Sequence, residues 1–142
     1  MKKTVLAFSR ITPPMIERLQ EEFDVIVPNP KTGDINAQFN EALPHAHGLI
    51  GVGRKLGRAQ LQSATKLEVV SSVSVGYDNY DLDYFNQRGI MLTNTPDVLT
   101  ESTADLAFAL IMSSARRVAE LDAWTKAGLW QASVGAPLFG TD

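Results

Sequence analysis

The fold is decided by residues 67–92, which read LEVVSSVSVGYDNYDLDYFNQRGIML. The apolar run at 67–72 predicts a buried strand, a loop containing Gly76 follows it, and Leu82–Arg88 has the spacing of a helix. The run Ile90–Leu92 predicts the next strand. Because a helix that connects two apolar strands forms a crossover, this stretch predicts two parallel strands of one sheet.

The same alternation of strand and helix runs through the preceding residues. Further strands are expected at 5–8, 24–27 and 48–52. Helices are expected after Pro13-Pro14, at 34–43 with Asp34 as its N-cap, and over a short segment at 58–64. Continuous apolar strands separated by helices predict a flavodoxin-like α/β fold, an open parallel sheet with helices on both faces.

The pattern changes at Thr100, where one long helix is expected to continue to about Ala127. Its length would be roughly 40 Å at the standard rise per residue. Apolar and small residues recur on it, which favours burial on more than one side. Such a helix either lies within its own domain or bridges to a second domain and a second subunit. The sequence thus predicts a domain at 1–99, a linking or dimer helix at 100–127 and an arm at 128–142.

Composition narrows the class of protein. The chain has 142 residues, of which 44% are hydrophobic and 20% charged, as in ordinary globular domains. A net charge of -3 argues against nucleic-acid binding. There is no cysteine and no apolar run long enough to span a membrane, and the start reads as a strand, so a cytoplasmic location is expected. His45 and His47 have no third ligand nearby, so no metal site is expected.

Loops at the carboxyl ends of parallel strands are where ligands bind in such sheets. Three qualify, at 53–57, 74–79 and 93–97. The first resembles a dinucleotide fingerprint, but its third glycine comes one position late and no acidic residue ends the next strand. In the second, Gly76 either permits a tight turn or frees backbone N–H groups for an anion such as an α-keto carboxylate. Spacing alone favours the turn.

Two segments together, Ser72–Asp81 and Asn94–Leu110, resemble the substrate-binding domain of the D-isomer-specific 2-hydroxyacid dehydrogenases, among them bacterial glyoxylate/hydroxypyruvate and 2-ketogluconate reductases. The resemblance implies that the backbone at Val75 and Gly76 holds the carboxylate of a small 2-keto or 2-hydroxy acid. It implies backbone contact from Gly53 and a cation from Arg54.

The resemblance also implies that Thr103 contacts the nicotinamide end of NAD or NADP, and that the protein is a homodimer. Two plainer roles remain open from the residues themselves. Arg54 could be a solvated surface charge, and the hydroxyls at 100–103 could cap the helix.

The family's true G-x-G-x-x-G motif, and its catalytic arginine, glutamate and histidine, have no matching positions in these residues. The expectation is therefore a catalytically incomplete fragment, the substrate-binding part of an NAD(P)H-dependent 2-keto acid reductase. The alternative is a stand-alone small-acid-binding or regulatory module. A phosphoreceiver would need acidic residues after the first strand. The sequence there is Ser9-Arg10-Ile11-Thr12, which argues against a phosphoreceiver.

Overall fold

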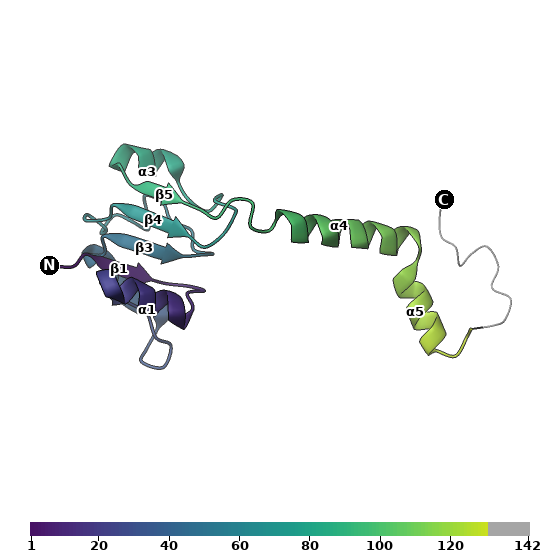
Figure 1. The fold of residues 1–142 in the computed structure, drawn as a ribbon. Coiled ribbons are helices and arrows are strands. Elements are labelled where there is room, and N and C mark those ends of the chain that lie inside the picture. The colour runs from purple at the N-terminus through teal and green to yellow at the C-terminus, as the bar shows by residue number, and fades with distance from the viewer. Residues whose placement is uncertain (131–142) are drawn as a thin grey trace. The chain divides into compact units, whose positions relative to one another are not determined.

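The computed structural model describes residues 1–130 and divides into two compact units. The first unit is Met1–Asp97, and the second begins at Val98. Figure 1 labels most elements of the first unit, which in chain order are β1 (Thr4–Ala7), α1 (Pro13–Glu22), β2 (Asp24–Ile26), α2 (Ile35–Ala42), η1 (Leu43–His45), β3 (Gly48–Gly51), β4 (Val69–Ser72), α3 (Leu82–Arg88) and β5 (Met91–Thr93).

The first unit is built on an open parallel sheet with the strand order β2-β1-β3-β4-β5. Every neighbouring pair is parallel, and the labelled strands point the same way in Figure 1. The register aligns Leu6 with Leu49, Leu49 with Val70, and Val70 with Leu92. This parallel order, with helices in every connection except the one from β3 to β4, confirms the flavodoxin-like α/β sheet predicted from the sequence.

The hydrophobic core lies on the face of the sheet that carries this row of residues. Leu6, Leu49 and Val70 are at most 1% exposed. They form one cluster with Phe39 of α2 and Phe85 of α3. Because side chains alternate between the faces of a strand, this one face takes every second residue of three neighbouring strands.

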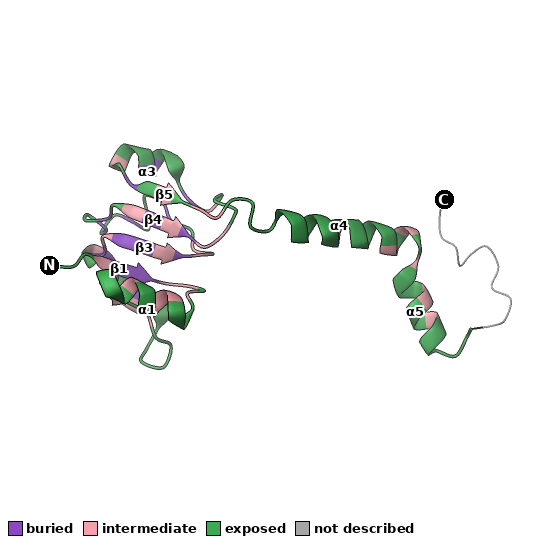
Figure 2. Cartoon of the chain, viewed as in Figure 1, coloured by how far each residue is buried: buried purple, intermediate pink, exposed green. Residues whose placement is uncertain are grey.

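The opposite face is covered less completely. Leu19 and Phe23, at the carboxyl end of α1, lie there beside Val5, yet no residue of α1 is buried. Met91 of β5 is 63% exposed. Figure 2 shows burial decreasing from β1 and β3 toward β5.

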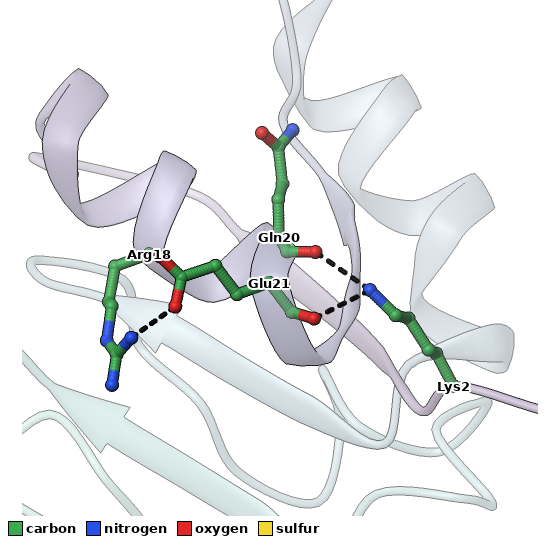
Figure 3. A network of polar contacts seen from close by, with 4 residues as sticks. All are labelled: Lys2, Arg18, Gln20 and Glu21. Atoms are coloured by element: carbon green, nitrogen blue, oxygen red, sulfur yellow. Dashed lines mark hydrogen bonds and ion pairs between the residues drawn. The ribbon is translucent and has the colours of Figure 1, made fainter.

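The amino terminus ties α1 to the sheet. The Lys2 ammonium group donates hydrogen bonds to the carbonyl oxygens of Gln20 and Glu21, at 2.9 Å each, and the Glu21 carboxylate pairs with Arg18 (Figure 3). The last carbonyls of a helix have no partner within it, and a cation there also complements the helix dipole. Lys2, which lies just before β1, thus stabilises the carboxyl end of α1.

Side-chain caps set the starts of α2 and α3. The Asp34 carboxylate accepts a hydrogen bond from the N–H of Ala37 at 2.7 Å, which confirms the predicted N-cap. Asp81 does the same for Tyr84 at 3.0 Å. Helix α3 ends at Gly89, whose left-handed φ of 68° suits glycine.

The helix predicted at 58–64 is wrong, because the segment is a series of turns. Its apolar side chains decide this difference. Leu56, Leu61 and Ala64 are fully buried in the core cluster, and separate backbone bonds such as Ala64 to Leu61 close the turns. Burial of these side chains overrides the helical spacing.

The single long helix predicted at 100–127 is also wrong. The second unit has two helices among its described residues, α4 (Thr100–Ala115) and α5 (Val118–Lys126). Arg117 lies between them with a left-handed φ of 56°, which interrupts the ladder of helical hydrogen bonds. Its guanidinium then pairs with Glu120 in the first turn of α5.

The side chains of α4 lie largely in solvent. None of its residues is buried, and four large apolar side chains are each at least 60% exposed: Leu106, Phe108, Leu110 and Ile111. Among the described residues, no helix has the length and apolar content needed to cross a membrane. The arm predicted at 128–142 falls mostly outside the described residues.

Candidate functional site

The strand order places a switch point between β1 and β3. From β1 the chain moves outward to β2, and it then returns to β3 on the other side of β1. The loops after β1 and β3 therefore turn in opposite directions and leave a crevice between them, which is where open α/β sheets bind ligands. The fold alone thus marks the carboxyl edge at β1 and β3.

A cavity of about 480 Å³ lies at this switch point. Its lining combines the loop after β1, the first turn of α2 and the loop after β3: Phe8, Ser9, Asn36, Val52, Gly53, Arg54 and Lys55. Gly53 has a φ of 80°, a conformation that residues with a side chain rarely adopt. The predicted residues Gly53 and Arg54 are therefore both at the cavity.

Arg54 is held in place by two contacts. Its Nη2 donates a hydrogen bond to Asn36 Oδ1 at 2.7 Å, and its Cζ lies 4.0 Å from the centre of the Phe39 ring. A guanidinium has five N–H donors in a fixed plane, so most remain for another acceptor. Such a planar cation suits a carboxylate or the hydroxyls of a sugar acid.

The loop after β4 presents backbone donors. In the described part of the chain, the N–H groups of Val75 and Gly76 have no hydrogen-bond partner. The carbonyl oxygens beside them are occupied: Ser74 accepts from the N–H of Thr95 at 3.0 Å, and Val75 accepts from Asn94 Nδ2 at 2.9 Å. Free N–H groups on an exposed loop can bind an anion.

The structure places the two predicted pairs on adjacent loops of the same edge. Gly51 and Ser72 are aligned in the register of β3 and β4, so both loops leave the sheet at one level. Asn79 joins the loops, because its Nδ2 donates to the carbonyl of Arg54 at 2.7 Å and its own carbonyl accepts from Leu56. Val75 and Gly76 do not line the cavity that contains Gly53 and Arg54.

Thr103 belongs to the second unit. It lies in the first turn of α4, is exposed, and donates its backbone N–H to Leu99 at 2.9 Å. Ser102 Oγ donates to the same carbonyl at 3.2 Å. The hydroxyl of Ser102 thus has a structural role at the helix start, and the helix has no side-chain N-cap.

Phe8, Ser9 and Asn36 line the cavity but lie far in sequence from the loop predicted at 53–57. Phe8 and Ser9 follow β1, and the rule that ligands bind at the switch point could have identified them once the strand order was known. Asn36 had no signal, since an amide in the first turn of a helix is common. Its role depends on Arg54, a contact 18 residues away in sequence.

Clear pKa shifts occur in two ion pairs, one in each unit. A hydrogen bond from Lys3 lowers the pKa of Glu68, and a hydrogen bond from Arg117 lowers the pKa of Glu120. Both are exposed carboxylates in ion pairs. Within residues 1–130, no three histidine, aspartate or glutamate side chains are grouped as a metal site requires.

The sequence matches the family model of the D-isomer specific 2-hydroxyacid dehydrogenase catalytic domain over residues 5–135. The chain belongs to this family. One relative, glyoxylate/hydroxypyruvate reductase B of Yersinia enterocolitica, is 45% identical to this chain. The match covers all 142 residues of this chain and 44% of the relative's length. The resemblance inferred from the two loops and the helix start is confirmed.

Solved structures agree with this assignment to the dehydrogenase family. The NADPH-dependent glyoxylate/hydroxypyruvate reductase of Sinorhizobium meliloti, in complex with NADP and malonate, is 29% identical with a TM-score of 0.71 over 100% of this chain and 43% of its own. The D-lactate dehydrogenase of Aquifex aeolicus is 22% identical, and its TM-score of 0.78 over 99% of this chain and 41% of its own shows a common fold. The family consists of NAD(P)-dependent oxidoreductases, and the chain spans less than half the length of these three relatives.

Proposed function

We propose that this chain is the substrate-binding part of an NAD(P)H-dependent reductase of small 2-keto acids, a D-2-hydroxyacid dehydrogenase. The candidate substrates are glyoxylate, hydroxypyruvate and 2-ketogluconate, of which the first two occur in the names of relatives. The observation that carries the proposal is the loop after β4, where the N–H groups of Val75 and Gly76 have no partner among the described residues.

The substrate carboxylate would accept hydrogen bonds from Val75 and Gly76. Charge-assisted hydrogen bonds of this kind are shorter and stronger than neutral ones, so two of them can fix one end of a small acid. Gly53 would contribute backbone contact from the neighbouring loop. Arg54 would bind the distal hydroxyls of longer substrates, because Asn36 and Phe39 already hold its guanidinium at the cavity.

The cofactor, NAD or NADP, would be held mainly by parts of the protein outside these residues. When bound, it supplies the hydride that reduces the keto group. Thr103 is the position of this chain that we assign to its nicotinamide end. No residue of this chain is assigned as the catalytic acid or base, so the chain alone would orient the substrate without reducing it.

We further propose that the complete protein is a homodimer in the cytoplasm. The apolar side chains of α4 need a covering surface, because Leu106, Phe108 and Ile111 are 60–66% exposed. A second copy of the chain could supply it. Sedimentation equilibrium of the complete product of the reading frame should give twice the monomer mass, and a monomer mass would contradict the dimer.

The activity is tested by comparing this chain with the complete product of its reading frame. NADPH and NADH oxidation would be followed with each of the three keto acids. We expect turnover by the complete product and none by residues 1–142 alone. Keto acid binding without any oxidation of either nicotinamide would instead favour the stand-alone binding module.

A further inference from the structure

A chain of three side-chain hydroxyls runs from the core of the first unit to the loop after β4. The Tyr80 hydroxyl lies 2.9 Å from Ser72 Oγ, and Ser72 Oγ lies 2.8 Å from Ser74 Oγ. Ser74 Oγ in turn lies 2.7 Å from the carbonyl oxygen of Gly76. Ser72 is 2% exposed and Tyr80 is 6% exposed, so the inner part of this hydroxyl chain is shielded from water. Hydrogen bonds are stronger in the protein interior than in water.

The last acceptor fixes the direction of every hydrogen bond in the hydroxyl chain. A carbonyl oxygen can only accept, so Ser74 donates its one hydrogen to Gly76. Ser72 must then donate to Ser74, and Tyr80 must donate to Ser72, because each hydroxyl has a single hydrogen. All three hydrogens therefore point toward the loop, and the Gly76 carbonyl is held at its end.

Each of three successive carbonyls in this loop is bound by a protein donor. Ser74 accepts from the N–H of Thr95, Val75 accepts from Asn94 Nδ2, and Gly76 accepts from Ser74 Oγ. In a planar trans peptide, the N–H points away from the carbonyl of the same peptide. The N–H of the following residue therefore points away from the protein group that binds the carbonyl of the same peptide.

The N–H that the hydroxyl chain orients is that of Tyr77, since it shares a peptide with the Gly76 carbonyl. Within residues 1–130 this N–H has no hydrogen-bond partner, as is also true of Val75 and Gly76. Successive N–H groups on one loop form anion-binding sites, and a carboxylate has lone pairs for more than two donors.

We propose that the N–H of Tyr77 is a third donor to the bound carboxylate, and that Tyr80, Ser72 and Ser74 are positioning residues that hold it toward the ligand. The inference rests on the proposed function, because the ligand is the carboxylate of the keto acid. It assigns to the buried hydroxyls an effect on affinity that packing alone does not provide.

The first test follows the Tyr77 amide by nuclear magnetic resonance in the complete product of the reading frame, with isotopically labelled tyrosine. Tyr77→Phe identifies the signal, because it removes the label and keeps the N–H. On addition of glyoxylate, the signal should shift and its hydrogen exchange should slow. A Tyr77 signal that stays unchanged while calorimetry shows glyoxylate binding would overturn the third donor, whereas absence of any binding would overturn the proposed function itself.

The second test uses matched variants of the hydroxyls. Ser74→Ala should weaken glyoxylate binding roughly tenfold, as loss of a charge-assisted contact does. It should also move the Tyr77 signal in the ligand-free protein. Ser74→Thr keeps the hydroxyl and should restore both readouts.

Tyr84 provides the control for Tyr80. Both tyrosines are 6% exposed, but the Tyr84 hydroxyl accepts from Arg88 at 2.7 Å and, within residues 1–130, makes no hydrogen bond to the loop after β4. Tyr80→Phe should weaken glyoxylate binding about threefold through the two serines, while Tyr84→Phe should leave it unchanged. Equal weakening by both variants would mean a general loss of stability and would overturn the positioning role.

Discussion

The two units of the chain differ in where their apolar side chains lie. In the first unit, the sheet residues Leu6, Leu49 and Val70 are at most 1% exposed against α2 and α3. In α4 the side chains of Leu106 and Leu110 are each 60% exposed. The difference indicates that the first unit supplies its own core, whereas the apolar surface of α4 is suited to covering by another protein surface.

The largest expected effect comes from the same substitution made in each unit. Leu6→Ala should lower the free energy of unfolding by about 2–5 kcal/mol, because it leaves a cavity in a packed core. Leu110→Ala should change it by less than about 0.5 kcal/mol, because that side chain has little to lose in solvent. Urea unfolding of both variants measures the difference.

Equal losses for the two leucines would break the comparison, since they would mean that Leu110 is packed as tightly as Leu6. In the complete product of the reading frame, we expect the roles to separate again. There Leu110→Ala should weaken dimerisation, and Leu6→Ala should leave the dimer mass unchanged in whatever fraction folds.

This contrast also explains what the sequence could predict. The strand, loop, helix and strand at 67–92 were predicted correctly, because the apolar runs, the Asp81 cap and Gly89 are all local features of the sequence. The turns at 58–64 were missed because burial of Leu61 and Ala64 is a tertiary effect. The break at Arg117 was missed because arginine is a good helix former and no glycine or proline marks the site.

For the candidate site too, local features could be predicted from the sequence and distant contacts could not. Gly53 and Gly76 stand after apolar strands, so loops at one sheet edge could be inferred from the sequence. The partners of those loops could not, because Asn36, Asn79 and Asn94 contact them across gaps of 18, 25 and 19 residues. Such pairings depend on strand order.

A smaller effect is expected on KM when an arginine at the cavity is replaced and compared with an arginine elsewhere in the first unit. Arg54→Ala should raise KM for 2-ketogluconate roughly tenfold, which corresponds to about 1.4 kcal/mol, and should raise KM for glyoxylate less than about twofold. The longer acid has hydroxyls that can reach the guanidinium, and glyoxylate has none. Steady-state kinetics of the complete product measures both values.

Arg58 is the matched control for Arg54. It too donates to a side-chain amide, Gln87 Oε1 at 2.9 Å, and lies over a ring, 5.0 Å from the centre of Tyr84. It is not among the residues that line the cavity at the switch point. Arg58→Ala should leave both KM values unchanged. The same KM change in both variants would remove Arg54 from the site.

The smallest expected effect is on the melting temperature, when one ion pair of each unit is removed in turn. Lys3 and Glu68 lie 65 residues apart in sequence and join the start of β1 to the start of β4. Arg117 immediately precedes α5 and pairs with Glu120 in the first turn of that helix. In both pairs a hydrogen bond lowers the carboxylate pKa from its usual value near 4.5. A lowered folded-state pKa gives stability that is present above 4.5 and is lost as the pH falls through the lower, folded value.

Glu68→Gln should therefore lower the melting temperature of the first unit slightly at neutral pH and have no effect in acid below the folded-state pKa. Glu120→Gln should leave that melting temperature unchanged at every pH, because its partner is local and belongs to the second unit. Thermal unfolding of both variants across the acid range, followed by a signal from the sheet, measures this. A pH-dependent loss in Glu120→Gln equal to that in Glu68→Gln would show that the two units unfold together, since only then would a local pair in α5 stabilise the sheet.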